Sequence, residues 1–382
     1  MLALGAALAA AGASGVAVLP PPPPQVGSAA HNATASHRHR SRIIWWTYAL
    51  PRDPIVIAGT YNPITGKEVP MPLDRRAFLA LAAGVAAPAI LRAAPRRKRY
   101  PIAFSTLGCP AWSWGRILEQ ADALGYSALE LRGIAGEMDL TKVPELSGTR
   151  LSETRRELDG RGLVVSDLGA SAHMHEKDPA ARAKQEDDGR HFIDLAHAMG
   201  VKYVRMFGNE VPKGETREEV LPRVIEGFRK MATYAKPAGV VVLIESHGDF
   251  TNSRDLTEIL TGVNDDSFAL LWDAHHTFVA GHEAPADTYA RLGRWVRHTH
   301  LKDSRPAGDA AKPEDRRYVL TGTGEVPVDK QVAVLAQAGY KGYYCYEWEK
   351  KWHPEIEDPE VAFPHYANTM AGYLDAAGVK PA

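Results

Sequence analysis

Residues 189–207 read GRHFIDLAHAMGVKYVRMF and contain one copy of the unit that repeats along the fold. In the first part, apolar side chains recur every three to four residues, the period of one face of a helix. Gly200 follows, a residue that commonly ends a helix in the left-handed conformation. The next run, KYVRMF, has the length of a buried strand. The stretch therefore predicts a helix, a glycine and a strand in direct succession.

The same unit recurs along the chain from Tyr100 onward. Short apolar runs occupy residues 101–107, 127–131, 163–168, 202–207, 240–245, 268–273, 296–301 and 343–347, with amphipathic stretches between them. Eight strands alternating with eight helices over about 280 residues have the size and order of a (β/α)8 TIM barrel. A doubly wound open sheet is the alternative, but no glycine-rich phosphate loop follows the first run. We predict a single α/β domain, a TIM barrel, over residues 95–382.

The N-terminal part differs in composition from the predicted barrel. Residues 1–30 are rich in Ala and Gly and contain five consecutive prolines, a composition that cannot build a packed core. We expect residues 1–70 to be either a disordered extension or an upstream artefact, with the natural start of the protein at Met71. The barrel region carries no apolar run long enough to span a bilayer.

A second motif follows at residues 71–94. Arg75 and Arg76 precede Phe78 and Leu79, and a modest apolar stretch and small residues come next. This arrangement resembles a twin-arginine export signal, which implies a periplasmic protein with no stable membrane anchor after cleavage. A short buried or membrane-anchoring helix is the alternative.

The charge of the predicted barrel argues against a nucleic-acid partner. Residues 95–382 hold 37 of the 45 Lys and Arg and 43 of the 46 Asp and Glu, a net charge of −6. A phosphate backbone is bound by clustered Lys and Arg, so an acidic domain is a poor candidate for it. A small molecule is the expected partner, and a homo-oligomer stays open.

The carboxyl ends of the last four predicted strands carry acids and imidazoles. In chain order these residues are Glu245 and His247, then Asp273, His275 and His276, then His298, His300, Lys302 and Asp303, and finally Glu347 and Glu349. In a TIM barrel the chemistry lies at this end of the strands. Gathered carboxylates repel one another unless a cation lies among them. The pattern predicts a divalent metal site, suited to Mn²⁺ first and to Mg²⁺, Co²⁺ or Zn²⁺ as alternatives.

Four stretches carry a family resemblance: IESHGD (244–249), WDAHH (272–276), HTHLKD (298–303) and YEWEKKWHPEIEDPE (346–360). They make the barrel similar to the xylose isomerase-like superfamily of sugar isomerases and epimerases, which also includes inosose dehydratases. The resemblance implies that the metal ligands are Glu245, Asp273, His300 and Glu347. On the last strand we choose Glu347 over Glu349 because Glu347 ends the apolar run.

The resemblance also implies a reaction class. A divalent metal polarises the carbonyl of a keto-sugar, a carboxylate removes the neighbouring proton, and the metal stabilises the enediolate. We expect Glu245 and Glu347 to be the acid/base pair of an isomerase or epimerase. A dehydratase acting on a keto-sugar or inosose through the same enediolate is the alternative.

Further residues are candidates for substrate binding. They are His276, His247, Glu130, His173, Lys302 and Trp112. Each has a structural alternative: Glu130 could cap a loop, Lys302 could pair with Asp303, and Trp112 could pack in the core. Arg205 is expected to pair with a carboxylate of the barrel wall. Cys109 and Cys345 are expected to be buried thiols rather than a disulfide.

Two other classes of protein use such a barrel. An apurinic endonuclease would need three zinc ions, histidines after the second and third strands and an Asp-x-His after the seventh. No Asp-x-His occurs between His300 and Glu347, and Glu130 ends the second strand without a histidine. A non-catalytic carbohydrate-binding barrel is disfavoured by the full set of ligands.

Overall fold

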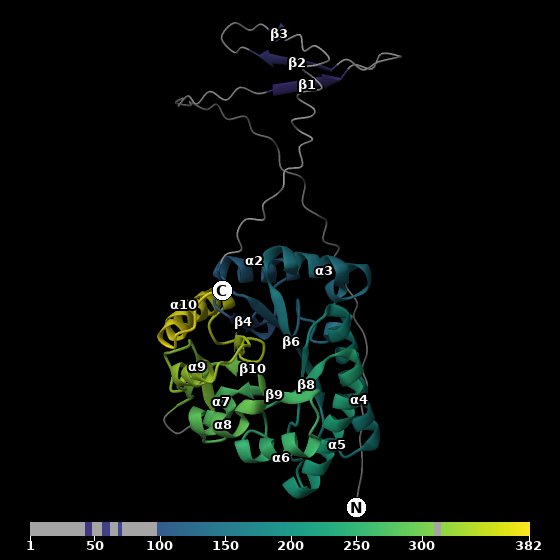
Figure 1. Cartoon of the computed structure of the whole chain (residues 1–382), viewed down its shortest axis with the longest axis vertical. Helices are drawn as coiled ribbons and strands as arrows, with labels where there is room; N and C mark the ends of the chain where they lie inside the picture. The colour runs from purple at the N-terminus through teal and green to yellow at the C-terminus, as the bar shows by residue number, and fades with distance from the viewer. Residues whose placement is uncertain (1–42, 48–55, 62–67, 71–97, 309–314) are drawn as a thin grey trace, which may run out of the picture. The chain divides into compact units, whose positions relative to one another are not determined.

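The computed structural model describes residues 98–308 and 315–382, together with three short strands nearer the N-terminus (Figure 1). These are β1 (Ile43–Thr47), β2 (Val56–Tyr61) and β3 (Glu68–Pro70), an antiparallel sheet that the sequence analysis did not predict. The predicted export signal and most of the predicted extension lie outside the described residues. The chain divides into two units, residues 1–91 and 92–382.

The strands of the second unit form a closed parallel barrel (Figure 1). They are β4 (Ile102–Ser105), β5 (Ala128–Leu131), β6 (Val164–His173), β7 (Tyr203–Phe207), β8 (Val241–Glu245), β9 (Phe268–Asp273), β10 (Val296–Leu301) and β13 (Tyr344–Tyr346). They follow one another around the ring in chain order, and β13 pairs with β4 to close it. Each strand overlaps one of the apolar runs, although β6 continues five residues beyond the run 163–168, so the predicted TIM barrel is confirmed.

Successive side chains of a strand point alternately toward the helices and into the barrel. On β9, Leu270 and Trp272 pack in the main core against the helices, whereas Ala269 and Leu271 belong to a small separate cluster. Asp273 is the next residue in the series of Ala269 and Leu271. The period of two thus directs a carboxylate inward at the end of the strand.

The helices surround the strands (Figure 1). They are α2 (Trp114–Leu124), α3 (Gly148–Arg161), α4 (Pro179–Met199), α5 (Arg217–Ala235), α6 (Ser253–Val263), α7 (Ala274–Val279), α8 (Pro285–Leu292), α9 (Val328–Gln337) and α10 (Pro359–Ala376). Gly200, which the sequence predicted to end a helix, has φ +73° and is the C-cap of α4. Two helices, α7 and α8, follow β9 where one was predicted.

A hairpin extends the connection after β10. It consists of β11 (Asp303–Pro306) and β12 (Arg316–Val319), which pair antiparallel. The buried Asp303 carboxylate accepts hydrogen bonds from the backbone N–H groups of Ser304, Gly322, Gly324 and Val326, at 2.8, 2.9, 2.9 and 3.1 Å. Asp303 therefore ties the hairpin to the segment that leads into α9.

The two ends of the barrel unit lie side by side. The backbone N–H of Arg99 donates to the carbonyl of Ala382 at 3.2 Å, and the N–H of Ala382 donates back to Arg99 at 3.1 Å. Among the described residues, no helix combines the length and the apolar character needed to cross a membrane.

Candidate metal centre

The structure brings the four predicted metal ligands together at the carboxyl ends of their strands. One ligand atom from each of Glu245, Asp273, His300 and Glu347 lies within 4.8 Å of the others. His300 Nδ1 faces all three carboxylates, at 3.4 Å from Glu245 Oε1, 3.9 Å from Asp273 Oδ2 and 3.1 Å from Glu347 Oε2. All four side chains are buried. One imidazole nitrogen and three carboxylates thus converge on one point.

Several of these atoms lack the hydrogen bonds that buried polar atoms normally make. His300 Nδ1, Asp273 Oδ2 and Glu245 Oε2 are buried and accept or donate no hydrogen bond. Lys302 Nζ makes an ion pair with Asp273 Oδ2 at 2.7 Å, and Arg205 Nε makes one with Glu245 Oε2 at 3.0 Å. One imidazole nitrogen and several carboxylate oxygens that converge without hydrogen bonds are suitable ligands for a divalent cation that prefers oxygen.

The charges around this point are not balanced by the side chains alone. Among the described residues, five buried carboxylates cluster here, from Glu130, Glu245, Asp273, Glu347 and Glu349. Three buried cations oppose them, from Arg132, Arg205 and Lys302. With the His300 imidazole neutral, as a metal ligand must be, two negative charges remain, and one divalent cation would neutralise them.

The pKa shifts express the same excess of negative charge. Burial is the main cause that raises the pKa of Asp273 to about 7; Glu347 and Glu245 raise it further, while Lys302 opposes the shift. Burial disfavours the imidazolium form of His300, but Glu130, Glu347 and Glu245 together hold its pKa well above the usual value. The site therefore attracts positive charge strongly.

Lys302 is fully buried at the centre of this cluster. Its ammonium group contacts Glu347, lies 2.8 Å from Glu349 Oε1 and pairs with Asp273. Asp303, the alternative partner in the sequence analysis, is occupied by backbone N–H groups instead. Lys302 lies among the predicted ligands, as a substrate-binding role would require.

His247 and His276 lie beside the predicted ligands. The His276 ring is partly exposed, and its Nε2 lies 3.4 Å from Asp273 Oδ2. The His247 ring lies 5.0 Å from that of His276 and 4.8 Å from that of Phe207. Burial lowers the pKa of both imidazoles, His276 more strongly, so they are neutral near pH 7. Two neutral imidazoles next to the metal centre are suited to hydrogen-bond a hydroxylated substrate.

His173 and Trp112 are placed differently. His173 ends β6, where it bonds Glu176 at 2.9 Å and stacks on His175 with ring centroids 4.7 Å apart. Trp112 is only 4% exposed and packs edge-on against Phe363. Because its ring is covered by the core, the structure places Trp112 in core packing rather than at a sugar face.

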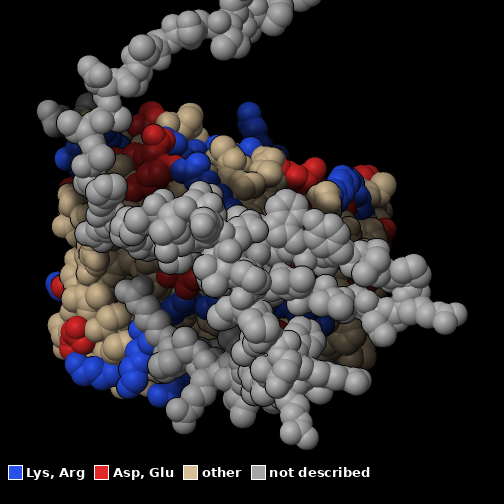
Figure 2. Space-filling view, turned by 90° about the horizontal axis from the view of Figure 1, so that it is seen from above, with Lys and Arg blue, Asp and Glu red and all other residues tan. Residues whose placement is uncertain are grey.

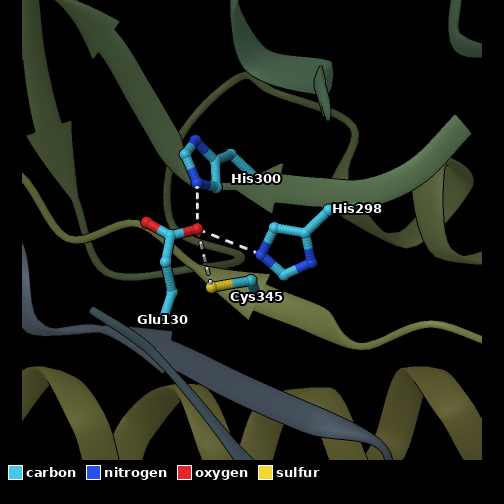
Figure 3. Close-up of side chains that lie close together, drawn as sticks. All are labelled: Glu130, His298, His300 and Cys345. Carbon is cyan, nitrogen blue, oxygen red and sulfur yellow. Dashed lines mark hydrogen bonds and ion pairs between the residues drawn. The ribbon is translucent and has the colours of Figure 1, made fainter. Parts of the chain in front are cut away.

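Glu130 does not lie with the candidates for substrate binding. Its fully buried carboxylate lies inside the barrel, where Oε2 is 2.6 Å from His300 Nε2 and 3.0 Å from His298 Nε2 (Figure 3). This position, on the far edge of the His300 ring, sets Glu130 apart from His247 and His276, and a substrate contact by Glu130 stays a prediction. Cys345 lies nearby, and Cys109 and Cys345 are both buried free thiols, as predicted. Arg205 pairs with the wall carboxylate Glu245, also as predicted.

Sequence reasoning missed two charged residues of the barrel interior. Asp167 on β6 is fully buried and its carboxyl makes no hydrogen bond, and burial raises its pKa well above the usual value. Arg132, which follows β5, donates to Ser171 Oγ at 2.9 Å, and its Nη1 has no partner. A charged residue within the run LVVSDL (163–168) was the available signal for Asp167.

The chain resembles known proteins in sequence and in fold. A family model described as xylose isomerase-like TIM barrel matches residues 118–365. L-ribulose-5-phosphate 3-epimerase UlaE of Escherichia coli O157:H7 (strain EC4115 / EHEC) is 24% identical over 290 residues, which are 74% of this chain and 98% of the relative.

Two solved structures share the fold. The IOLI protein with a bound zinc atom has a TM-score of 0.61 and 19% identity, covering 72% of this chain and 98% of that one. The probable 3-DHS dehydratase AsbF from Bacillus anthracis has a TM-score of 0.58 and 16% identity, covering 71% and 98%. With the family model spanning most of the barrel, the chain belongs to the xylose isomerase-like TIM barrel family.

Proposed function

We propose that the protein is a divalent-metal-dependent sugar epimerase or isomerase that acts on a keto-sugar. Glu245, Asp273, His300 and Glu347 are the metal ligands, and Mn²⁺ is the metal that we expect. The observation that carries the proposal is the buried convergence of three carboxylates and His300 Nδ1 with two negative charges left unbalanced. The epimerase relative supports the substrate class, since a ribulose phosphate is a keto-sugar.

The chemistry divides between the metal and the side chains. A bound divalent cation acts as a Lewis acid on the carbonyl of the substrate. Glu245 and Glu347, which lie 3.4 and 3.1 Å from the same His300 nitrogen, are close enough to act on neighbouring substrate atoms. One carboxylate removes the proton next to the carbonyl, and the other returns a proton to the opposite face.

The neighbouring cations keep these two glutamates ionised, as a base requires. Burial alone would raise the pKa of Glu245, but Arg205 lowers it below the usual value. For Glu347, His300 and Lys302 overcome burial in the same way and hold the pKa well below the usual value. His247, His276 and Lys302 orient the substrate hydroxyl groups.

A dehydratase is the second candidate function. Loss of a β-hydroxyl from the same enediolate gives dehydration instead of epimerisation, and AsbF, a probable dehydratase, shares the fold. In epimerisation the carbon next to the carbonyl regains a proton, whereas in dehydration the β-hydroxyl leaves, so the products distinguish the two reactions.

The experiment that tests the proposal combines metal content with solvent exchange. Residues 95–382 would be purified, assayed for bound metal by elemental analysis, and incubated with ketopentoses and ketohexoses in D₂O. We expect about one divalent metal per chain and deuterium at the carbon next to the carbonyl, detected by NMR. Epimerisation gives a sugar of unchanged mass apart from the deuterium, whereas dehydration loses water.

Asp273→Asn is the diagnostic variant, because it removes one ligand charge, and Asp266→Asn is the matched control. Asp266 is an exposed aspartate in the loop before β9. Metal and exchange should be lost in the first variant and kept in the second. A wild-type protein without bound metal, even after Mn²⁺ is supplied, would exclude the proposed mechanism.

We also propose that residues 71–94 direct twin-arginine export to the periplasm and that the barrel operates there as a free carbohydrate enzyme. Basic and acidic side chains are interspersed on the part of the surface visible in Figure 2, which agrees with a small-molecule partner rather than a nucleic acid. A fusion of residues 71–94 to a reporter should be exported by a twin-arginine host. Export that persists after Arg75→Lys and Arg76→Lys together would contradict this proposal.

A further inference from the structure

We propose that Glu130 is a positioning residue: it holds His300 with Nε2 protonated and Nδ1 free to bind the metal, and His298 holds Glu130 in place. This inference rests on the proposed metal site. It assigns a role to a carboxylate that lies at the opposite side of the imidazole from the other three acids.

The contacts of the His300 ring support this assignment. Nε2 lies 2.6 Å from Glu130 Oε2, while Nδ1 on the other edge faces Glu245 and Glu347 at 3.4 and 3.1 Å. Figure 3 shows the Glu130 carboxylate lying between the His300 and His298 rings. An ionised carboxylate has no proton to donate, so the imidazole must donate from Nε2. A neutral His300 then has its lone pair on Nδ1, which is the nitrogen that faces the predicted ligands.

His298 completes the arrangement. Its Nε2 lies 3.0 Å from the same Oε2 atom of Glu130. At this distance His298 Nε2 can donate its N–H to the carboxylate, as His300 Nε2 does from the other side. Both rings come from β10, so this one strand fixes the orientation of the Glu130 carboxylate, whose own backbone lies on β5.

Two other roles for Glu130 fit the geometry less well. A substrate contact would require Glu130 on the same side of His300 as the proposed ligands, but its carboxylate lies at Nε2, on the opposite edge of the ring. A second metal bound by Glu130, His298, His300 and Cys345 would need room between its ligands. A separation of 2.6 Å between Nε2 and Oε2 is that of a charge-assisted hydrogen bond. Carboxylates that orient metal-binding histidines in this way commonly change metal affinity by about 10- to 100-fold.

The test measures Mn²⁺ affinity rather than turnover alone. Isothermal titration calorimetry would be run on the metal-free wild-type chain and on Glu130→Gln, Glu130→Asp and Glu186→Gln. Glu186 on α4 is the matched control, a buried glutamate that pairs with Lys230 and Arg190 away from the barrel interior. We expect Kd for Mn²⁺ to rise about 10- to 100-fold in Glu130→Gln, since a neutral amide holds the tautomer weakly. Glu130→Asp keeps the charge and should show a smaller rise.

The outcomes separate this inference from the proposed function. A wild-type chain that binds no Mn²⁺ would overturn both. If the wild type binds and Glu130→Gln binds within about threefold of it, only the role of Glu130 is wrong. The visible spectrum of bound Co²⁺ provides a second readout, because a reoriented imidazole changes the ligand field while a general loss of stability does not. Should Glu130→Gln not fold, the same two comparisons are made with Glu130→Asp, and an unchanged affinity and spectrum there overturn the proposal.

Discussion

Gly169 on β6 allows two guanidinium groups to lie inside the barrel. A Cβ atom at this position would lie 2.7 Å from Arg132 Cδ and 2.7 Å from Arg205 Nη2. Both distances are too short for non-bonded heavy atoms, so a larger residue must push at least one arginine away. Arg205 carries the ion pair with Glu245, and its position therefore affects one of the proposed acid/base residues.

Gly169→Ala should therefore lower catalytic turnover more than it lowers stability. We expect the free energy of unfolding to fall by about 1–3 kcal/mol, as for other overpacked interiors. Gly372→Ala is the control: it lies within α10 with no atom near its added Cβ, and alanine should be neutral or stabilising there. Chemical denaturation and the deuterium-exchange assay would be compared for both variants. Equal exchange rates in the two would show that Arg205 does not depend on Gly169.

At the residue scale, the sequence identified side chains that end strands but not those that meet across the barrel. Glu245, Asp273 and Glu347 each end an apolar run, and the period of two places them inward. Glu130 and His300 are 170 positions apart and on β5 and β10, so their contact depends on the closed ring. For Trp112 the sequence pattern does not decide where the side chain points, since an aromatic residue after a strand can face either a ligand or the core.

At the element scale, the β11–β12 hairpin depends on one buried carboxylate. Asp303→Ala should remove the carboxylate that accepts four hydrogen bonds from backbone N–H groups, and those N–H groups would lose their partner. We expect a loss on the order of 3 kcal/mol in the free energy of unfolding, because each unsatisfied buried group costs about 1–3 kcal/mol and water replaces some of the partners.

Denaturant unfolding of Asp303→Ala, with exposed Asp266→Ala as control, measures this loss. Hydrogen exchange should also become faster at Gly322 and Gly324, whose N–H groups donate to Asp303. A variant as stable as the control, with unchanged exchange, would show that the hairpin is held by other contacts. The sequence did not predict this element because DSRP and RRYV are polar and lack the alternation of a half-buried strand.

For the whole molecule, metal binding should stabilise the barrel. The four proposed ligands come from the ends of four different strands, spread from Glu245 to Glu347, so they converge only in the folded chain. Free Mn²⁺ at 100 times its Kd should raise the free energy of unfolding by about 2.7 kcal/mol. Thermal unfolding with Mn²⁺, and again with a chelator, measures the difference. Asp273→Asn should show none of it, and a wild-type chain insensitive to both additions would count against the metal centre.

The fold of the whole barrel was predictable because local and global patterns agree. Each strand overlaps a short, mostly apolar run, and Gly200 ends its helix with the positive φ that the sequence suggested. Eight such units have few ways to bury their apolar faces other than a closed ring. The sequence did not predict that the helical region after β9 is divided into α7 and α8, because a break within a helical region depends on packing against its neighbours.

The backbone pairing of Arg99 with Ala382 gives the barrel a property that its linear sequence hides. Since the two positions already lie within hydrogen-bond distance, a few glycine residues would join them into a continuous ring of chain. New ends could then be opened elsewhere, for example at the exposed Gly214 between β7 and α5. Such a circular permutant should fold and keep its metal affinity. The permutation changes the order of the βα units in the sequence, but the same strand ends still meet at the carboxyl end of the barrel.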